Sequence, residues 1–456
     1  MHSVWAVAKN TLAQAIRMKV AVIIIILLVI LLPLMSVIMV GDGTLLGKLQ
    51  TFVSYGLSLT GLLLCLLTIT VSTFTLTNDI RQMQLHLVVT KPIKRFEILC
   101  GKLLGVVILD ILLLSVFASV IYCLTLLIPR LSKAGADELA GAGREFFTAR
   151  VSLSADVDED KIDMLAKQAY EKLERNRQLP ASMTKEQILS ELRGRERTQA
   201  QAVEPGAQRV WEFENVRPAD PNETLFVRYK YEVSVEPPDY RVYGTWLTGD
   251  YRQIKYGMGD WDSPVARIER SELIRQFHEF EVSAEVVASD GYLALIFANN
   301  PYLNMTTIIP QEVQVLLKTG SFTGNYIRAV LLILARLIFL ATLGISVSTW
   351  LSFPVAVLIC AVVFFVGTIN GFVLESLGVL DQTPNIIYNL TLRPILWLMP
   401  RLDGRFNPTH YMISAEVLSW RFLGQVYLMM VFLKSLFLLI FGIWIFSNRE
   451  IAKVVV

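Results

Sequence analysis

The stretch Asn78–Gly105, NDIRQMQLHLVVTKPIKRFEILCGKLLG, is a polar connection between two strongly apolar segments. Each of these segments is long enough to cross a bilayer, which takes about 20 mainly apolar residues. Basic loops stay in the cytoplasm when a membrane protein inserts. The basic residues of the connection include Lys91, Lys94, Arg95 and Lys102. The sequence therefore predicts a membrane protein with a cytoplasmic loop at residues 77–102.

The composition of the chain also favours a membrane protein. Apolar residues make up 54% of the 456 residues, and the mean hydropathy of +0.50 is high for a soluble protein. The formal net charge of +2 gives no reason to expect a nucleic-acid partner. The cysteines match neither a disulfide framework nor a set of metal ligands, and they are Cys65, Cys100, Cys123 and Cys360.

The predicted fold class is an α-helical polytopic membrane protein with six transmembrane helices. The spans are Val20–Val40, Tyr55–Leu76, Leu103–Ile128, Tyr326–Val347, Phe353–Leu374 and Gln425–Phe446. Basic residues before the first span, between the second and third, and after the last place both termini in the cytoplasm. Residues 1–19 are predicted to form an amphipathic helix on the cytoplasmic face. The alternative is that they simply continue the first span.

The insert between the third and fourth spans, residues 129–325, is predicted to be an extracytoplasmic α+β domain. It is mainly an antiparallel β-sandwich, because short strand-like runs alternate with turn residues. These runs are 146–153, 210–216, 225–235, 279–287, 292–298 and 312–317. The segment 156–201 is rich in charge and in helix formers, and it is predicted to be a helical excursion from the sheets.

The connection before the last span, residues 375–424, is longer than an ordinary loop and is also placed outside the cytoplasm. Its segment 386–398 is apolar but is interrupted by Asn389, Arg393 and Pro394. This pattern predicts a re-entrant or interfacial helix, and the sequence does not distinguish between the two. The predicted order of parts is 1–19, 20–128, 129–325, 326–374, 375–424 and 425–456.

No motif for catalysis or for phosphate binding is found. Gly43–Lys48 lacks the spacing of a P-loop, and the sequence contains neither HExxH nor GxSxG. We therefore expect no catalytic residue, no metal site and no cofactor on this chain. Charged residues inside spans are functional candidates because they are costly in lipid. They are Asp110, Arg336 and Lys434. Either they pair to fix helix packing, or they line a substrate path or a subunit interface.

Aromatic residues and carboxylates of the insert suggest a glycan contact, because such side chains stack on sugars and hydrogen-bond to them. The aromatic residues are Tyr240, Tyr243, Trp246 and Trp261, and they lie near Asp239, Asp250 and Asp262. The alternative is that these aromatic residues pack in the core of the domain.

The connection quoted at the outset resembles the coupling loop of permease subunits of the type-2 ABC (ABC-2) exporter family. The matching features are Asp79 after the second span, Lys91-Pro92, the run Lys94-Arg95-Phe96-Glu97-Ile98-Leu99, and Gly101-Lys102. The family more often has Glu where this chain has Asp79. The resemblance extends to the helix Trp5–Arg17, the six spans and the turn at Ser352-Phe353-Pro354.

The resemblance implies that residues 80–88 form a coupling helix that docks on a separate ATP-binding subunit. ATP and Mg²⁺ would then bind to that partner, and two permease chains would assemble in the inner membrane of a bacterium. The implied ATPase contacts are Asp79, Arg81, Met83, Leu85, His86, Leu87, Pro92, Lys94 and Arg95. The alternative for this loop is that its basic residues are only solvated or meet anionic lipid.

Three functions are open at this point. In the first, which the resemblance favours, the chain is a permease subunit that couples ATP hydrolysis by its partner to export of a substrate. Alternatively, the same motor moves the outer domain against an extracytoplasmic partner, and nothing is transported. The third possibility is a membrane receptor or scaffold outside the ABC class, whose sandwich binds glycan or protein. The sequence determines neither the substrate nor whether the dimer is homomeric or heteromeric.

Overall fold

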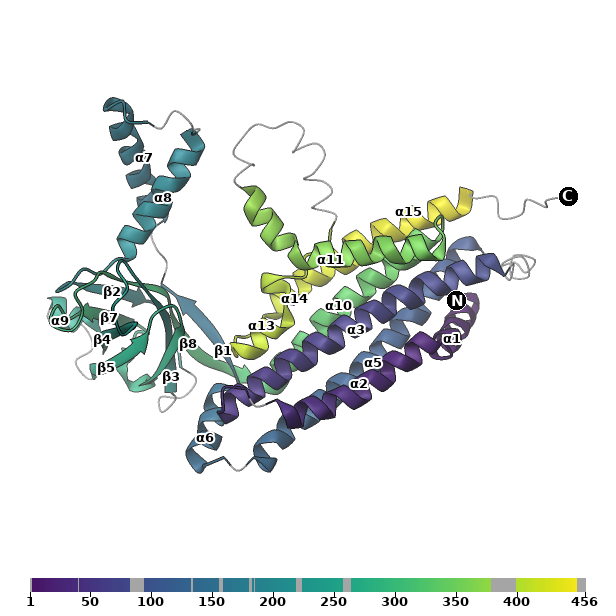
Figure 1. The fold of residues 1–456 in the computed structure, drawn as a ribbon, viewed down its shortest axis with the longest axis horizontal. Helices are drawn as coiled ribbons and strands as arrows, with labels where there is room; N and C mark the ends of the chain where they lie inside the picture. The colour runs from purple at the N-terminus through teal and green to yellow at the C-terminus, as the bar shows by residue number, and fades with distance from the viewer. Residues whose placement is uncertain are drawn as a thin grey trace. The chain divides into compact units, whose positions relative to one another are not determined.

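The chain divides into two compact units in the computed structural model. The described residues are 2–39, 41–82, 94–132, 134–155, 159–179, 183, 185–218, 224–256, 264–378 and 399–448. The helical unit comprises Met1–Ala149 and Gly320–Val456, and the sheet unit comprises Arg150–Thr319. Figure 1 shows the helices of the first unit and the strands of the second.

In the described part of the helical unit, six helices are long and apolar enough to cross a membrane. The first five are α2 (Lys19–Ile38), α3 (Leu45–Arg81), α5 (Arg95–Leu131), α10 (Phe322–Ser348) and α11 (Phe353–Gly378). The sixth, Trp420–Asn448, is built from α14 (Trp420–Val426), the π-helix η4 (Tyr427–Lys434) and α15 (Ser435–Asn448). These helices confirm the six predicted segments. The segment 386–398 lies outside the described residues.

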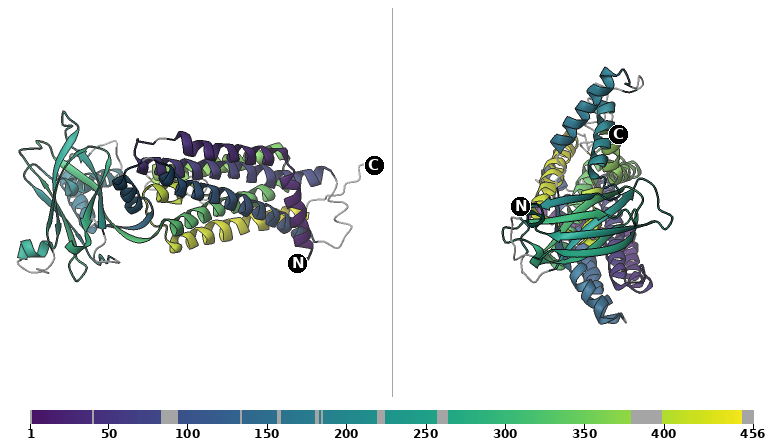
Figure 2. Two further views of the ribbon diagram at one scale, coloured as in Figure 1. Left: turned by 90° about the horizontal axis from the view of Figure 1, so that it is seen from below. Right: turned by 90° about the vertical axis from the view of Figure 1, so that its left-hand side faces the viewer.

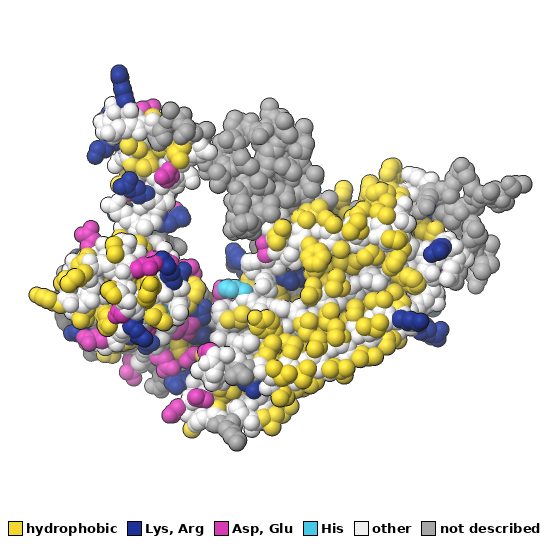
Figure 3. Space-filling view, viewed as in Figure 1, with side chains coloured by type: hydrophobic (Ala, Val, Ile, Leu, Met, Phe, Trp, Pro, Cys, Tyr) yellow, Lys and Arg dark blue, Asp and Glu magenta, His cyan; other side chains and the backbone are white. Residues whose placement is uncertain are grey.

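Helix α10 is in contact with α3, α5, α11 and α15, and Figure 2 shows the long helices of this unit lying side by side. Helix α10 approaches α3 closely at Gly344, where an added Cβ would lie 1.9 Å from the Ser72 hydroxyl oxygen. Small residues allow such close helix contacts in membranes. Hydrophobic side chains cover much of the visible outer face of the bundle (Figure 3). A soluble monomer rarely exposes an apolar surface of this extent.

Helix α1 (His2–Ile16) packs against α5 rather than continuing α2. An added Cβ at Gly101 of α5 would lie 2.8 Å from the Val4 carbonyl oxygen, and one at Gly105 would lie 2.7 Å from that of Ala8. The two glycines therefore let the backbones approach closely. Helix α1 lies within the segment 1–19 that was predicted to be helical, and its place on the cytoplasmic face stays a prediction. Ala8 of this helix is buried, whereas Trp5 is 59% exposed. The described residues of the unit also form three shorter helices, α6 (Ala136–Glu145), η3 (Gly404–Phe406) and α13 (Pro408–Ile413).

The sheet unit is built on two four-stranded antiparallel sheets, in the orders β1-β8-β3-β6 and β2-β7-β4-β5. The strands are β1 (Thr148–Ser154), β2 (Gln208–Phe213), β3 (Thr224–Val233), β4 (Arg241–Gly249), β5 (Ala266–Leu273), β6 (Phe277–Ser283), β7 (Leu293–Asn299) and β8 (Ile308–Ser321). Strand β3 pairs antiparallel with β6 and β8, and β4 pairs antiparallel with β5 and β7. Each sheet is open at both edges, so the sheets do not close into a barrel. Strands β4 and β5 were not predicted.

One aromatic core joins the two sheets. Trp246 of β4 is fully buried, and its ring centroid lies 4.7 Å from that of Tyr229 on β3. The Trp246 indole N–H donates to the Tyr231 hydroxyl over 2.9 Å, and the Tyr229 hydroxyl donates to Glu272 over 2.5 Å. Two helices, α7 (Glu159–Arg175) and α8 (Lys185–Gln201), lie within the segment 156–201 that was predicted as a helical excursion, and they pack together. A short helix, α9 (Tyr251–Tyr256), follows β4.

Candidate functional site

The candidate site is the end of the helical unit that bears the connection between α3 and α5. We call it the connection end. It consists of the last turn of α3, the first turns of α5, the turn between α10 and α11, and the end of α15. These segments are Asp79–Arg81, Lys94–Lys102, Trp350–Pro354 and Phe446–Ser447.

A buried ion pair joins α3 to α5 at this end. The Lys102 ammonium nitrogen lies 2.6 Å from a carboxylate oxygen of Asp79, and the two side chains are only 2% and 14% exposed. The ammonium also donates to the Thr75 carbonyl over 2.8 Å, and the Gln14 amide of α1 donates to Asp79 over 3.5 Å. Three helices therefore meet at one carboxylate. An ion pair this poorly hydrated depends strongly on the presence of both partners.

The start of α5 is also bonded to the end of α15. Arg95 donates to the Phe446 carbonyl over 2.9 Å and to the Ser447 carbonyl over 2.7 Å. A guanidinium is well placed at a helix C-terminus, where carbonyl groups lack helical partners and the helix dipole is negative. At the first turn of α5, the Glu97 carboxylate accepts the Lys94 backbone N–H over 3.2 Å. Both flanks of the connection are thus bonded to neighbouring helices.

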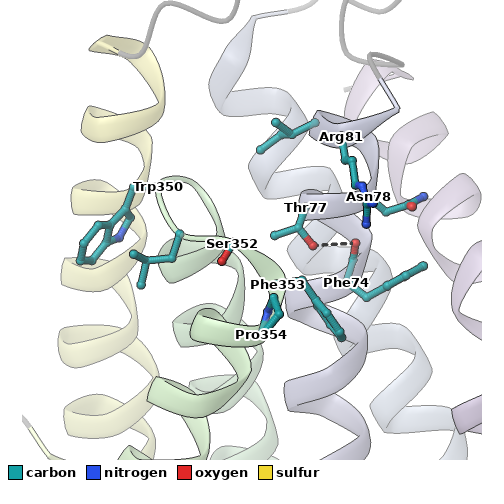
Figure 4. Close-up of a pocket in the computed structure, with 10 residues that line it drawn as sticks. Phe74, Thr77, Asn78, Arg81, Trp350, Ser352, Phe353 and Pro354 are labelled. Atoms are coloured by element: carbon teal, nitrogen blue, oxygen red, sulfur yellow. Dashed lines mark hydrogen bonds between the residues drawn. The ribbon is translucent and has the colours of Figure 1, made fainter.

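A groove opens beside the last turn of α3. It has a volume of about 470 Å³, and the α10–α11 turn forms its other wall. Figure 4 shows Phe74, Thr77, Asn78 and Arg81 on the α3 side and Trp350, Ser352, Phe353 and Pro354 on the side of the turn. The rings of Phe74 and Phe353 meet edge to face, with centroids 5.8 Å apart. Trp350 is 49% exposed. The lining combines apolar and aromatic side chains with polar ones, a composition that suits the binding of another polypeptide.

The predicted ATPase contacts are only partly within the described residues. Of these contacts, Asp79 is paired with Lys102, Arg81 lines the groove, Lys94 is exposed, and Arg95 is bonded to α15. The other predicted contacts, Met83, Leu85, His86, Leu87 and Pro92, lie outside the described residues. The sequence analysis missed the ion pair and the groove. The only signal for the groove was the short Ser352-Phe353-Pro354 turn, because its apposition to α3 depends on the fold.

The three charged residues inside the spans have separate partners. Asp110 is fully buried and accepts from the Thr68 hydroxyl over 2.7 Å. Arg336 donates to the carbonyls of Leu402 and Phe406, and Lys434 donates to the Met399 carbonyl over 2.8 Å. The ion pairs of the described residues include none between Asp110 and either cation. The expectation that these three charges pair is therefore not met by this structure.

The suggested glycan contacts do not form one surface among the described residues. Trp246 lies in the core with no exposed surface, so it cannot stack on a sugar, and its assignment to a glycan site was wrong. Tyr243 donates its hydroxyl to Asp239 over 2.9 Å, and Tyr240 is 54% exposed. Trp261 lies outside the described residues. Within the described part of the chain, no group of three or more His, Cys, Asp or Glu side chains is placed to hold a metal ion.

An ionic cluster of the sheet unit joins the start of α9 to the turn before β7. Arg252 donates to the fully buried Asp250 over 2.8 Å and to Asp290 over 2.6 Å. The Arg252 guanidinium holds the pKa of Asp290 below its usual value, mainly through these hydrogen bonds. Burial, together with its hydrogen bond to Glu212, raises the pKa of Tyr292. These hydrogen bonds hold the start of α9 against the turn before β7, and we assign the cluster a structural role.

Comparisons of the chain with protein-family models, with curated proteins and with solved structures found no match.

Proposed function

We propose that this chain is the membrane-spanning permease subunit of an ABC-2 type exporter, located in the inner membrane of a bacterium. A separate ATP-binding subunit binds ATP and Mg²⁺ and docks at the connection end. A second permease chain completes the assembly, and membrane lipid surrounds it. The observation that carries the proposal is the position of the family-like loop, whose two flanks are joined by the Asp79–Lys102 ion pair beside an open groove.

The bonds at the connection end suggest how force would enter the bundle. A partner that contacts the connection acts on α3 and α5 together, because Asp79 and Lys102 join them. The same displacement reaches α1 through Gln14 and α15 through Arg95. Four helices would therefore respond to one contact. A surface with this property suits the transmission of a conformational change rather than simple anchoring.

The test is co-purification of the full chain with an ATP-binding subunit from its own host, followed by reconstitution and measurement of ATPase activity. Leu87→Asp in the connection and Trp350→Ala in the groove are expected to lower the ATPase activity stimulated by this chain at least about tenfold, or about 1.4 kcal/mol. Trp420→Ala is the matched control, because Trp420 is 59% exposed and lies at the opposite end of the last span. Absence of an ATP-binding protein from the purified complex would contradict the proposal.

A second candidate is mechanical work on an extracytoplasmic partner without transport. It is favoured by the continuity between β8 and α10, since β8 ends at Ser321 and α10 begins at Phe322. The Ser321 side chain caps α10 by accepting the Gly324 N–H over 3.3 Å. Movement of α10 would thus be passed directly to a central strand of a sheet. ATPase activity that is stimulated by an outer partner in sealed vesicles, with no substrate uptake, would favour this candidate over export.

A further inference from the structure

A second cavity lies on the helical unit, away from the connection end. It has a volume of about 440 Å³ and is formed by the segment before α13 together with α14 and η4. Its lining is mainly apolar but holds two basic side chains. The residues that line it are Pro400, Arg401, Phe406, Phe422, Gln425, Val426, Leu428, Met429, Met430 and Lys434.

The two basic side chains come from different elements and share this one cavity. Arg401 is exposed, and Lys434 is partly buried at the end of η4. The Lys434 ammonium donates to the Met399 carbonyl over 2.8 Å, and this bond fixes its position at the wall. Arg401 and Lys434 carry charges of the same sign and line the same cavity, and like charges brought together repel each other. The described lining contains no acidic side chain, so an anion in this cavity would relieve the repulsion.

The helix that forms one wall is widened at this point. Residues Tyr427–Lys434 form a π-helix, and the Ser435 hydroxyl donates to the Met430 carbonyl over 2.9 Å. π-Helical segments are rare and occur frequently at functional sites. The widened turn places Met429, Met430 and Lys434 in the same wall. Methionine side chains are flexible and adapt to apolar ligands of different shapes.

The remaining wall suits a hydrocarbon chain. The rings of Phe406 and Phe422 lie 5.3 Å apart between their centroids, and Leu428 and Met429 are more than half exposed beside them. We infer that this cavity binds an anionic amphiphile, with a phosphate group at Arg401 and Lys434 and its apolar chain along Phe422, Leu428 and Met429. The inference rests on the proposed membrane setting but not on an ATP-binding partner, so it is tested on this chain alone.

The experiment titrates the purified full-length chain, in a neutral detergent, with dihexanoyl phosphatidic acid below its micelle-forming concentration. Dihexanoyl phosphatidylcholine and inorganic phosphate are titrated in parallel by calorimetry. We expect phosphatidic acid to bind at least about tenfold more tightly than either comparison ligand. Arg401→Gln and Lys434→Met are each expected to weaken it about tenfold. Arg421→Gln is the matched control, because Arg421 is exposed on α14 but does not line the cavity.

Three results would overturn the inference. Equal binding of phosphatidylcholine would show that the charges do not select the ligand. Inorganic phosphate binding as tightly as phosphatidic acid would show that the apolar wall contributes nothing and that the site takes free phosphate. An equal loss in the Arg421→Gln variant would show general surface attraction. Size-exclusion profiles verify folding, and Arg401→Gln keeps the test valid if Lys434→Met does not fold, since Arg401 is exposed.

Discussion

The Asp79–Lys102 ion pair gives the sharpest prediction about stability. Its atoms lie 2.6 Å apart and its side chains are 2% and 14% exposed, so each charge depends on the other for compensation. Replacing Asp79 by Ala leaves the Lys102 ammonium buried, with its hydrogen bond to the Thr75 carbonyl but without a carboxylate partner. Breaking a buried pair from one side costs about 3–5 kcal/mol. We expect a loss of this size for Asp79→Ala and a similar loss for Lys102→Met.

The double variant Asp79→Leu with Lys102→Met separates this explanation from a general loss of packing. Because an apolar pair of similar volume needs no compensation, the double variant is expected to recover most of the lost free energy. The assay is reversible unfolding in mixed micelles with increasing SDS, followed by tryptophan fluorescence. Lys94→Met is the control, since Lys94 is exposed at the same end. Single-variant losses below about 1 kcal/mol, the range of surface pairs, would refute the reasoning.

Three further predictions follow from the same structure. Gly101→Ala is expected to release α1 from α5 and speed proteolysis within α1, because the added Cβ would lie 2.8 Å from a carbonyl oxygen of α1. Gly61→Ala is the control and is expected to leave proteolysis unchanged, since the nearest atom to its added Cβ lies 4.0 Å away. Tyr231→Phe removes the acceptor of the buried Trp246 N–H, so it is expected to lower the free energy of unfolding in guanidinium titrations by about 1–3 kcal/mol. Tyr240→Phe is the control and is expected to leave the free energy of unfolding unchanged, because Tyr240 is exposed. Arg252 lowers the pKa of Asp290 in the folded state, so the carboxylate stabilises the fold above its unfolded pKa of about 3.9. This contribution is lost as the pH falls through the lower folded pKa. Asp290→Asn is therefore expected to flatten the loss of stability measured on acidification below about pH 4.

The parts of the fold that depend on local patterns were predictable. Runs of apolar residues located all six candidate spans, and charge with helix formers located α7 and α8. The ends of α3 and α5 were placed too far inside, because these helices continue into polar residues that a hydropathy pattern does not include. Strands β4 and β5 were missed because Gly244 interrupts the first and the second is a charged edge strand.

The parts that depend on long-range apposition were not predictable. Asp79 and Lys102 belong to two different helices, and only the packing of α3 against α5 decides whether they meet. Arg95 bonds to carbonyls more than 350 residues away in the sequence. Trp246 illustrates a further limit, since a sugar-binding surface and a packed core both use tryptophan, and only burial distinguishes them. The cavity at Arg401 and Lys434 has the same origin, because it joins two segments around a widened helical turn.

The length of α3 has a mechanical consequence. Its 37 residues make a rod of about 55 Å, whereas the hydrocarbon core of a bilayer is about 30 Å thick. One end of the rod holds Asp79, and α6 packs against the same helix. A rigid tilt of about 10° about its midpoint moves the two tips about 5 Å in opposite directions. Motion on one side of the lipid would thus reappear, reversed, on the other without any loop being remodelled.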